Sequence, residues 1–243
     1  MNMPPEQDKE FLIRFIRDAF RRTVAHYGLW LREVEHQFGL EIALDMEQEA
    51  GEKSLDIQVA RLGKILGFEV KNGVPAALYD LSEEKLTNLL DSLAANWLAN
   101  DGVWFQAVEQ QYGMFDAKRC NDSCWTRFSP LEARRIMELL DLPRNGGLEA
   151  LKVALGHRLY SRINVQSIVD EPDGSFVFQM NDCRVQSTRR RKGLEEYPCK
   201  SVGIVEYRSF AATIDPRIHT ECVGCPPDEH PDDWFCAWRF SIK

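Results

Sequence analysis

Five of the seven cysteines gather in the last third of the chain, and their thiols are the side chains best suited to chemistry. They are Cys183, Cys199, Cys222, Cys225 and Cys236. Soft sulfur ligands in a tetrahedral set favour zinc, and an iron–sulfur cluster comes second because the ferredoxin-type cysteine runs are absent. The sequence therefore predicts a zinc site in which Cys199, Cys222, Cys225 and Cys236 are the favoured ligands and Cys183 is the alternate.

The most specific part of this cluster is Cys222-Val223-Gly224-Cys225. Two thiols at this spacing can ligate one ion because a tight turn that contains glycine directs both sulfurs inward. Only one such motif is present, so two other interpretations stay open. One is a redox-active or nucleophilic thiol, and the other is a set of buried free cysteines that pack as small hydrophobes. His219, Asp228 and His230 lie in or beside the same loop and could complete an open catalytic site.

A run of four basic residues, Arg189 to Lys192, lies between Cys183 and Cys199. Such a run is typical of a solvated helix start or loop. It also fits a second role, in which Arg189 or Arg190 pairs with the carboxylate of a small anionic molecule or lowers the pKa of a neighbouring cysteine.

An internal repeat offers another pair of candidate residues. Gly28-Leu29-Trp30 through Gly39 aligns with Gly102-Val103-Trp104 through Gly113 at an offset of 74 residues. The similarity extends over about residues 28–66 and 102–140, which indicates a duplicated helical unit. It is either a packing element that was copied, or a device that places Glu35 and Glu109 as two carboxylates on a common cleft.

The elements that must position these residues are helical up to about residue 160. Apolar residues at three- and four-residue spacing predict helices, with a break near Tyr27-Gly28, a capping box from Asp80 to Glu83, and a helix start at Ser129-Pro130. The predicted ranges are 11–38, 41–50, 54–67, 82–99, 103–112, 129–141 and 147–160.

After about residue 160 the pattern changes to strands. Residues 163–169 and 175–185 predict a hairpin around the turn Glu171-Pro172-Asp173-Gly174. A helix over about 201–212 and strands over 217–222 and 234–242 complete an α+β class with an antiparallel sheet and helices on one face. We therefore expect a helical region over 1–160 and a cysteine-rich α+β module over 161–243.

Composition narrows the classes of protein that this chain can be. With 243 residues and a formal net charge of −8, it suits one large domain or two small ones and disfavours general nucleic-acid binding. The first ten residues lack the pattern of a signal peptide, and no apolar run approaches the roughly 18 residues of a membrane span. These features predict a cytoplasmic protein with reduced cysteines and no membrane partner.

Several of these segments resemble an uncharacterised bacterial and archaeal family of cytosolic proteins. They are Cys183 to Cys199 with the basic run between them, Ile214-Asp215-Pro216-Arg217-Ile218 to Cys222, Cys236-Ala-Trp-Arg-Phe, and the Gly-x-Trp-x-x-x-Val-Glu repeat at Gly28 and Gly102. More distantly, the cysteine-rich half is similar to 2-amino-thiazoline-4-carboxylate hydrolases and to vinyl-reductase-type ligand-binding domains. The latter end in Glu-x-x-Cys and Cys-x-Phe, whereas here Glu221 is adjacent to Cys222 and Trp238 interrupts the final motif. The resemblance implies an α+β ligand-binding module that in some members holds a metal.

Three hypotheses about function follow. The first is a metal-binding or small-molecule-binding protein. The second is a hydrolase of a C–N bond in a small cyclic or amidic acid, which would use a thiolate or a metal-activated water. The third is an interaction module whose contact surface is the Trp-bearing helices, and the sequence also allows a homodimer. Whether the chain is an enzyme stays open at this point.

Overall fold

The computed structural model describes residues 8–242, and the chain divides into two compact units at Ala76/Ala77. The first unit contains α1 (Lys9–Phe38), α2 (Leu40–Leu66) and a two-stranded ribbon of β1 (Val70–Lys71) and β2 (Val74–Pro75). The expected boundary near residue 160 falls inside the second unit, where helices on both sides of that point pack together.

The second unit begins with the 3₁₀ helix η1 (Ala76–Asp80) at the division and continues with a helical hairpin of α3 (Glu83–Tyr112) and α4 (Met114–Leu139). The remaining helical elements are α5 (Gly147–Gly156), the 3₁₀ helix η2 (Leu159–Arg162), α6 (Arg184–Arg191) and α7 (Lys200–Ile214). Its strands are β3 (Val165–Asp170), β4 (Phe176–Asp182), β5 (Ile218–Gly224) and β6 (Cys236–Ile242). The α+β class is confirmed.

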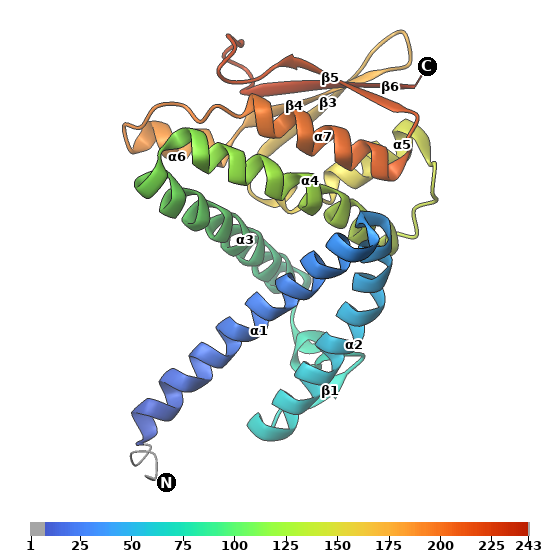
Figure 1. The fold of residues 1–243 in the computed structure, drawn as a ribbon. Coiled ribbons are helices and arrows are strands. Elements are labelled where there is room, and N and C mark those ends of the chain that lie inside the picture. The colour runs from blue at the N-terminus through green and yellow to red at the C-terminus, as the bar shows by residue number, and fades with distance from the viewer. Residues whose placement is uncertain (1–7, 243) are drawn as a thin grey trace. The chain divides into compact units, whose positions relative to one another are not determined.

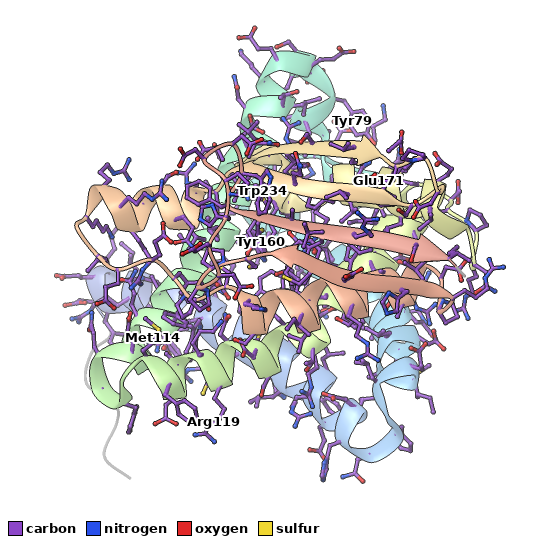
Figure 2. All side chains as sticks on the ribbon, turned by 90° about the horizontal axis from the view of Figure 1, so that it is seen from above. Tyr79, Met114, Arg119, Tyr160, Glu171 and Trp234 are labelled. Carbon is purple, nitrogen blue, oxygen red and sulfur yellow. The ribbon has the colours of Figure 1, made fainter. Side chains whose placement is uncertain are left out.

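The four strands form an antiparallel sheet in the order β3-β4-β6-β5, seen side by side in Figure 2. Alternation along β4 and β6 turns Phe176, Phe178, Trp238 and Phe240 toward a buried core. In Figure 1, α7 and α5 lie on one face of this sheet, and α4 packs against α7. The predicted arrangement, with helices on one face, is thus present.

The duplicated helical unit is visible as two hairpins of matching geometry. The helices α1 and α3 both span 30 residues, and each is joined to the next helix by a single glycine. Gly39 has φ 88° and ψ 164°, and Gly113 has φ 86° and ψ 172°, a region of backbone conformation open almost only to glycine. These glycines occupy equivalent positions in the two copies and therefore set the same reversal of the chain in both.

Several predicted helix boundaries are wrong. The helix α1 runs through Gly28 without a break, and α4 runs through Pro130, which is buried in the core rather than at a helix start. The ranges predicted separately at 41–50 and 54–67 form one helix, as do those at 82–99 and 103–112. Glycine costs a helix only about 1 kcal/mol, so a long helix that gains packing continues through it. The cap of α3 is Ser82, whose side chain accepts a hydrogen bond from the Lys85 amide, instead of Asp80.

The predicted end of the hairpin also needs correction. The strand β4 ends at Asp182, and the basic run belongs to the short helix α6, whose N-cap is Cys183. The sequence showed no helical period there because the run is too short and too charged. This helix is what turns the basic side chains toward the site described next.

Candidate functional site

A cavity of about 520 Å³ lies inside the second unit, between α3, α4, α6, α7 and the sheet. Its apolar lining includes six aromatic residues, Phe105, Trp125, Tyr160, Tyr197, Tyr207 and Trp238. Two smaller groups of side chains complete the wall: thiols on one part and basic residues of α6 on another. A volume of this size is typical of sites for small organic ligands.

Four of the five clustered cysteines line this cavity: Cys183, Cys199, Cys225 and Cys236. Each comes from a different place in the fold, namely the N-caps of α6 and α7, the residue after β5, and the first residue of β6. The thiol of Cys225 is within hydrogen-bonding reach of both Cys199 and Cys236. The sequence therefore identified thiols that the fold brings together from segments more than fifty residues apart.

Cys222 behaves differently from the other four. It lies within β5 opposite Trp238, and a β-bulge between Cys222 and Gly224 shifts the register of the strand. The expected tight turn is therefore absent, and Cys222 lines a separate pocket of about 470 Å³ with His219 and Arg208. The two thiols of the motif therefore line different pockets, which residue spacing alone does not reveal.

The cavity raises the pKa of two of its thiols. The pKa of Cys225 is raised by its hydrogen bonds with the Cys199 and Cys236 thiols and then by burial. The pKa of Cys183 is raised by burial and by the neighbouring Cys199. Both groups are therefore thiols rather than thiolates near neutral pH, which is unfavourable for a nucleophile. All seven cysteines, each within the described residues, are free.

No group of three or more His, Cys, Asp or Glu side chains in residues 8–242 is arranged so as to hold a metal ion. His219 is exposed on β5, Asp228 is paired with Lys200 at 2.6 Å, and the ring Nδ1 of His230 lies 2.8 Å from the Pro231 carbonyl. These three side chains are thus engaged elsewhere or exposed.

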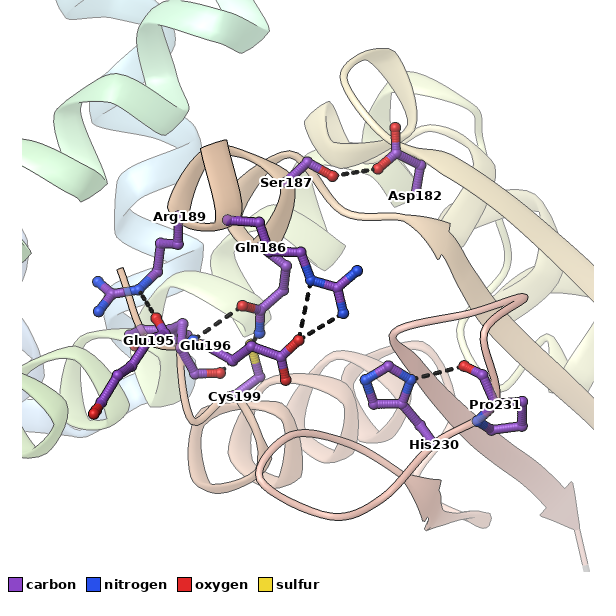
Figure 3. Close-up of polar contacts among 11 residues, drawn as sticks. Asp182, Gln186, Ser187, Arg189, Glu195, Glu196, Cys199, His230 and Pro231 are labelled. Atoms are coloured by element: carbon purple, nitrogen blue, oxygen red, sulfur yellow. Dashed lines mark hydrogen bonds and ion pairs between the residues drawn. The ribbon is translucent and has the colours of Figure 1, made fainter. Parts of the chain in front are cut away.

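Gln186 holds the thiol-bearing segment in place, and sequence reasoning missed it. It is buried in α6, donates from Nε2 to the Tyr197 carbonyl at 2.8 Å and to Cys199 Sγ at 3.2 Å, and accepts from the Tyr197 amide at 2.9 Å. Figure 3 shows it on α6, near Cys199 and the loop residues Glu195 and Glu196. A lone glutamine in a polar stretch carries no signal that distinguishes it from a surface residue.

The basic run splits into residues that line the cavity and one that does not. Arg189, Arg191 and Lys192 of the run contribute to the lining, as does Arg184 at the start of α6. All but Arg189 are exposed, so they mark the open side of the cavity. Arg190 instead pairs with Glu196 at 2.6 Å and lies over the Phe235 ring at 4.6 Å. Of the two arginines expected to bind an anion, the structure therefore places Arg189 at the cavity and Arg190 away from it.

The two glutamates of the repeat lie in different units. Glu35 of the first unit pairs with Arg32 at 2.6 Å. Glu109 of the second unit lies 3.8 Å from Arg189, whose Nε also donates to the Glu195 carbonyl at 2.6 Å (Figure 3). Two sequence candidates, Glu109 and Arg189, are thereby brought together, and Glu109 acts there as an anchor for the arginine.

Acidic groups on the cavity wall are largely compensated. Glu206 has a pKa raised by burial, against which the guanidinium of Arg158 acts at 2.7 Å. Asp101 has a pKa raised by burial, which the charge of Lys118 opposes. Lys118 also donates to the hydroxyl of Tyr197 at 3.1 Å. The uncompensated charge of the cavity is therefore positive and lies on its open side.

Comparison with known families shows that the chain belongs to a family of unknown function, DUF6125, whose model matches residues 6–81 and 77–242. Neither a curated protein nor a solved structure matches the chain. Within residues 8–242, no helix is both long and apolar enough to cross a membrane. The family match covers both hairpins and the cavity, so it applies to the whole arrangement described above.

Proposed function

We propose that the second unit is a binding module for a small anionic organic molecule, which enters the cavity past α6. The observation that carries this proposal is the cavity itself, in which a basic open side leads to an interior of aromatic rings and thiols. A carboxylate would pair with Arg191 or Arg184, and a flat apolar body would stack on Tyr197 or Trp125. This assignment keeps the anionic-ligand role expected of the basic run but moves it from Arg190 to its neighbours.

The test is calorimetric titration of the full chain with a panel of small cyclic and amidic carboxylates, thiazoline carboxylates among them. Arg191→Gln should weaken binding of any ligand found by about tenfold, because one charge-assisted hydrogen bond is lost. Arg190→Gln is the matched control, since it removes the same charge from the next residue but leaves the cavity lining intact. Equal weakening by both variants, or no binding by any carboxylate, would contradict the proposal.

A second function, metal binding, is favoured by the contact of Cys225 with two other thiols. Cys199, Cys225 and Cys236 would be the ligands, with Cys183 as the fourth sulfur. The side chains would have to rotate to enclose an ion, and the thiols would release protons as zinc bound. Iron–sulfur chemistry fits less well because the cysteine spacing lacks the ferredoxin-type run.

Elemental analysis with thiol titration before and after chelation tests this second function. Stoichiometric zinc that is lost in Cys225→Ser but kept in Cys222→Ser would support the cavity thiols as ligands. Zinc lost in both variants would restore the original ligand set with Cys222. A metal-free protein with seven freely titrating thiols would exclude the metal role.

A C–N hydrolase is a further proposal for the same cavity. The raised pKa values of Cys183 and Cys225 disfavour these two as nucleophiles. The nucleophile of such a hydrolase would therefore be Cys199, Cys236 or a metal-activated water. A single cysteine that is alkylated much faster than the others would identify the nucleophile.

A further inference from the structure

The helix α1 carries an apolar stripe along its whole length, and the described residues of the first unit leave most of it exposed. Its members recur at three- and four-residue spacing on one face of the helix. They are Leu12, Ile13, Ile16, Phe20, Val24, Tyr27, Trp30, Leu31, Val34 and Phe38. No residue of α1 is buried, and Phe20 and Trp30 are 53% and 62% exposed. So large an exposed stripe indicates a contact surface.

The duplicated hairpin of the second unit shows what such a face does when it is covered. Ala94 and Phe105 on α3 are both buried, and they correspond to Phe20 and Leu31 on α1. Phe105 packs in a cluster with Trp125 of α4, with Val202 of α7, and with Tyr197 in the loop before α7. Within residues 8–76 no element takes the place of α7. At these two positions α1 therefore carries apolar residues whose equivalents in α3 are covered, whereas Trp104 and Tyr112 of α3, like Trp30 and Phe38 of α1, are exposed.

A groove between α1 and α2 marks where a counterpart of α7 would sit. It has a volume of about 360 Å³ and is lined from both helices, with Tyr27, Trp30 and Val34 on α1 and Met46 and Ala50 on α2. Figure 1 shows that the two helices meet at one end and diverge from there. Since α1 is 30 residues long, about 45 Å, a second helix can lie along it for most of its length.

We infer that a second copy of this chain covers the stripe, with the two α1 helices packed antiparallel about a twofold axis. Charge favours this occupant over an unrelated one. Residues 9–22 of α1 contain five basic and two acidic residues, a net charge of +3, whereas residues 41–56 of α2 contain one basic and six acidic, a net charge of −5. Within one hairpin the acidic stretch lies beside the other end of α1, where Tyr27 donates to Glu47 at 2.6 Å.

Antiparallel pairing of two copies brings the basic stretch of each α1 next to the acidic stretch of the other copy's α2. The basic end of one α1 then lies along the far end of its partner's α1, which is where the partner's acidic stretch of α2 is found. Both contacts form at once because a twofold interface uses the same surface on each copy. The charges thus specify both the partner and the direction of packing.

The area available is that of a stable dimer. The four aromatic residues of the stripe are 38–65% exposed, which leaves about 400 Å² of aromatic surface on each copy at roughly 200 Å² per ring system. A standard interface buries about 800 Å² per partner. The aliphatic members of the stripe, from Leu12 to Val24, supply further surface of the same kind, so the stripe suffices without any contribution from the second unit.

Sedimentation equilibrium of the full chain over a wide concentration range tests the inference. We expect a species of twice the chain mass of 28.0 kDa. Phe20→Glu should raise the dimer dissociation constant at least about tenfold, because a charge replaces an apolar contact at the centre of the interface. Leu29→Glu is the matched control, since Leu29 is 66% exposed on the opposite face of the same helix and should leave the dimer intact.

The outcomes separate the alternatives. A monomer at every concentration would mean that the second unit of the same chain, or another protein, covers the stripe, and would overturn the inference. A dimer that Phe20→Glu does not weaken, or that Leu29→Glu weakens equally, would place the interface elsewhere. Circular dichroism of each variant above its dissociation constant checks that helix content is retained, and Ile16→Glu provides a second variant on the stripe.

Discussion

The two hairpins of this chain have the same backbone and different surroundings. The helices α1 and α3 begin 74 residues apart, have equal length, and are followed by glycines of nearly equal φ and ψ. In α3–α4 part of the inner face is covered by α7, and the hairpin forms one wall of the cavity. In α1–α2 the described residues of the first unit leave every side chain of α1 at least partly exposed. The comparison indicates that a duplicated unit can keep its fold while one copy lines a cavity and the other exposes an apolar stripe.

A buried ion-pair network marks the difference most clearly. Arg158 is 1% exposed, with Glu132 of α4 at 2.8 Å and Glu206 of α7 at 2.7 Å. Gln58 of α2 occupies the position that corresponds to Glu132 and donates to Ser54 of its own helix at 2.9 Å. Removal of Arg158 should therefore affect only the covered hairpin.

The largest expected effect is that of Arg158→Met, which leaves two buried carboxylates without a cation. It should lower the free energy of unfolding of the second unit by about 3–5 kcal/mol. Urea unfolding followed by tryptophan fluorescence measures this loss. Gln58→Met is the control at the equivalent position of the open hairpin and should change stability by less than about 0.5 kcal/mol.

The loss should also depend on pH. Burial already raises the pKa of Glu206 in the folded protein, and loss of Arg158 would raise it further. A carboxyl with a folded pKa above its unfolded value binds its proton more tightly when folded, so its contribution to stability is present at low pH and is lost as pH rises through the folded pKa. Arg158→Met should thus be less destabilised near about pH 5 than near about pH 8. A pH-independent loss would mean that the two carboxylates are hydrated in the variant.

The next effect compares equivalent positions on α1 and α3. Ala94 is fully buried, so Ala94→Glu should cost about 3 kcal/mol or more of stability. Phe20→Glu, at the corresponding position of α1, should change the unfolding of the dissociated chain by less than about 0.5 kcal/mol. Denaturant titrations at low protein concentration compare the two. Similar losses would show that the stripe on α1 is covered within the chain.

A smaller and equal effect is expected at the two glycine turns. Gly39→Ala and Gly113→Ala should each cost about 1–2 kcal/mol, because both require a positive φ that alanine adopts poorly. Among the described residues, apart from the glycine and its two neighbours in the chain, no heavy atom lies within 4 Å of the added Cβ at either site. The cost therefore comes from the backbone alone. Unequal values from thermal unfolding would contradict the claim that the two hairpins share one backbone.

The smallest effect concerns the charges at the α1 interface. A rise from low to high salt should weaken the dimer only a few-fold, since the apolar stripe carries most of the binding and exposed charges are screened. Sedimentation at two salt concentrations measures this. Tighter association at high salt would contradict the role assigned to the basic and acidic stretches in orienting the two copies.

Much of this arrangement could be predicted from the sequence. Composition and period gave the α+β class, and the Gly-x-Trp repeat predicted the duplicated unit that the hairpins display. Residue spacing failed where long-range packing overrides a local signal. Pro130 is a helix-start residue by type, but it lies inside α4 because the helix is held on both sides by α7 and the core.

The candidate site shows the same division. Five cysteines were singled out by type and clustering, and four of them line the cavity. Cys222 lies within β5 and lines another pocket, and the role of Gln186 depends on hydrogen bonds to the distant Tyr197, so neither is encoded in a local pattern. The helix α6 directs Arg191 and not Arg190 to the cavity. The sequence did not predict this helix, because the strand before it was expected to reach residue 185 and instead ends at Asp182.

The central claim is that the cavity accepts small anions beside its thiols, and peptide-resolved alkylation tests it most directly. Iodoacetate and iodoacetamide have nearly the same size, but only iodoacetate carries a carboxylate. The rate of alkylation by iodoacetate, divided by the rate with iodoacetamide, should be higher at Cys199 and Cys236 than at the exposed Cys120. Arg191→Gln should lower this ratio at the cavity cysteines, whereas Arg190→Gln should not. The same ratio at the cavity cysteines as at Cys120 would contradict the account.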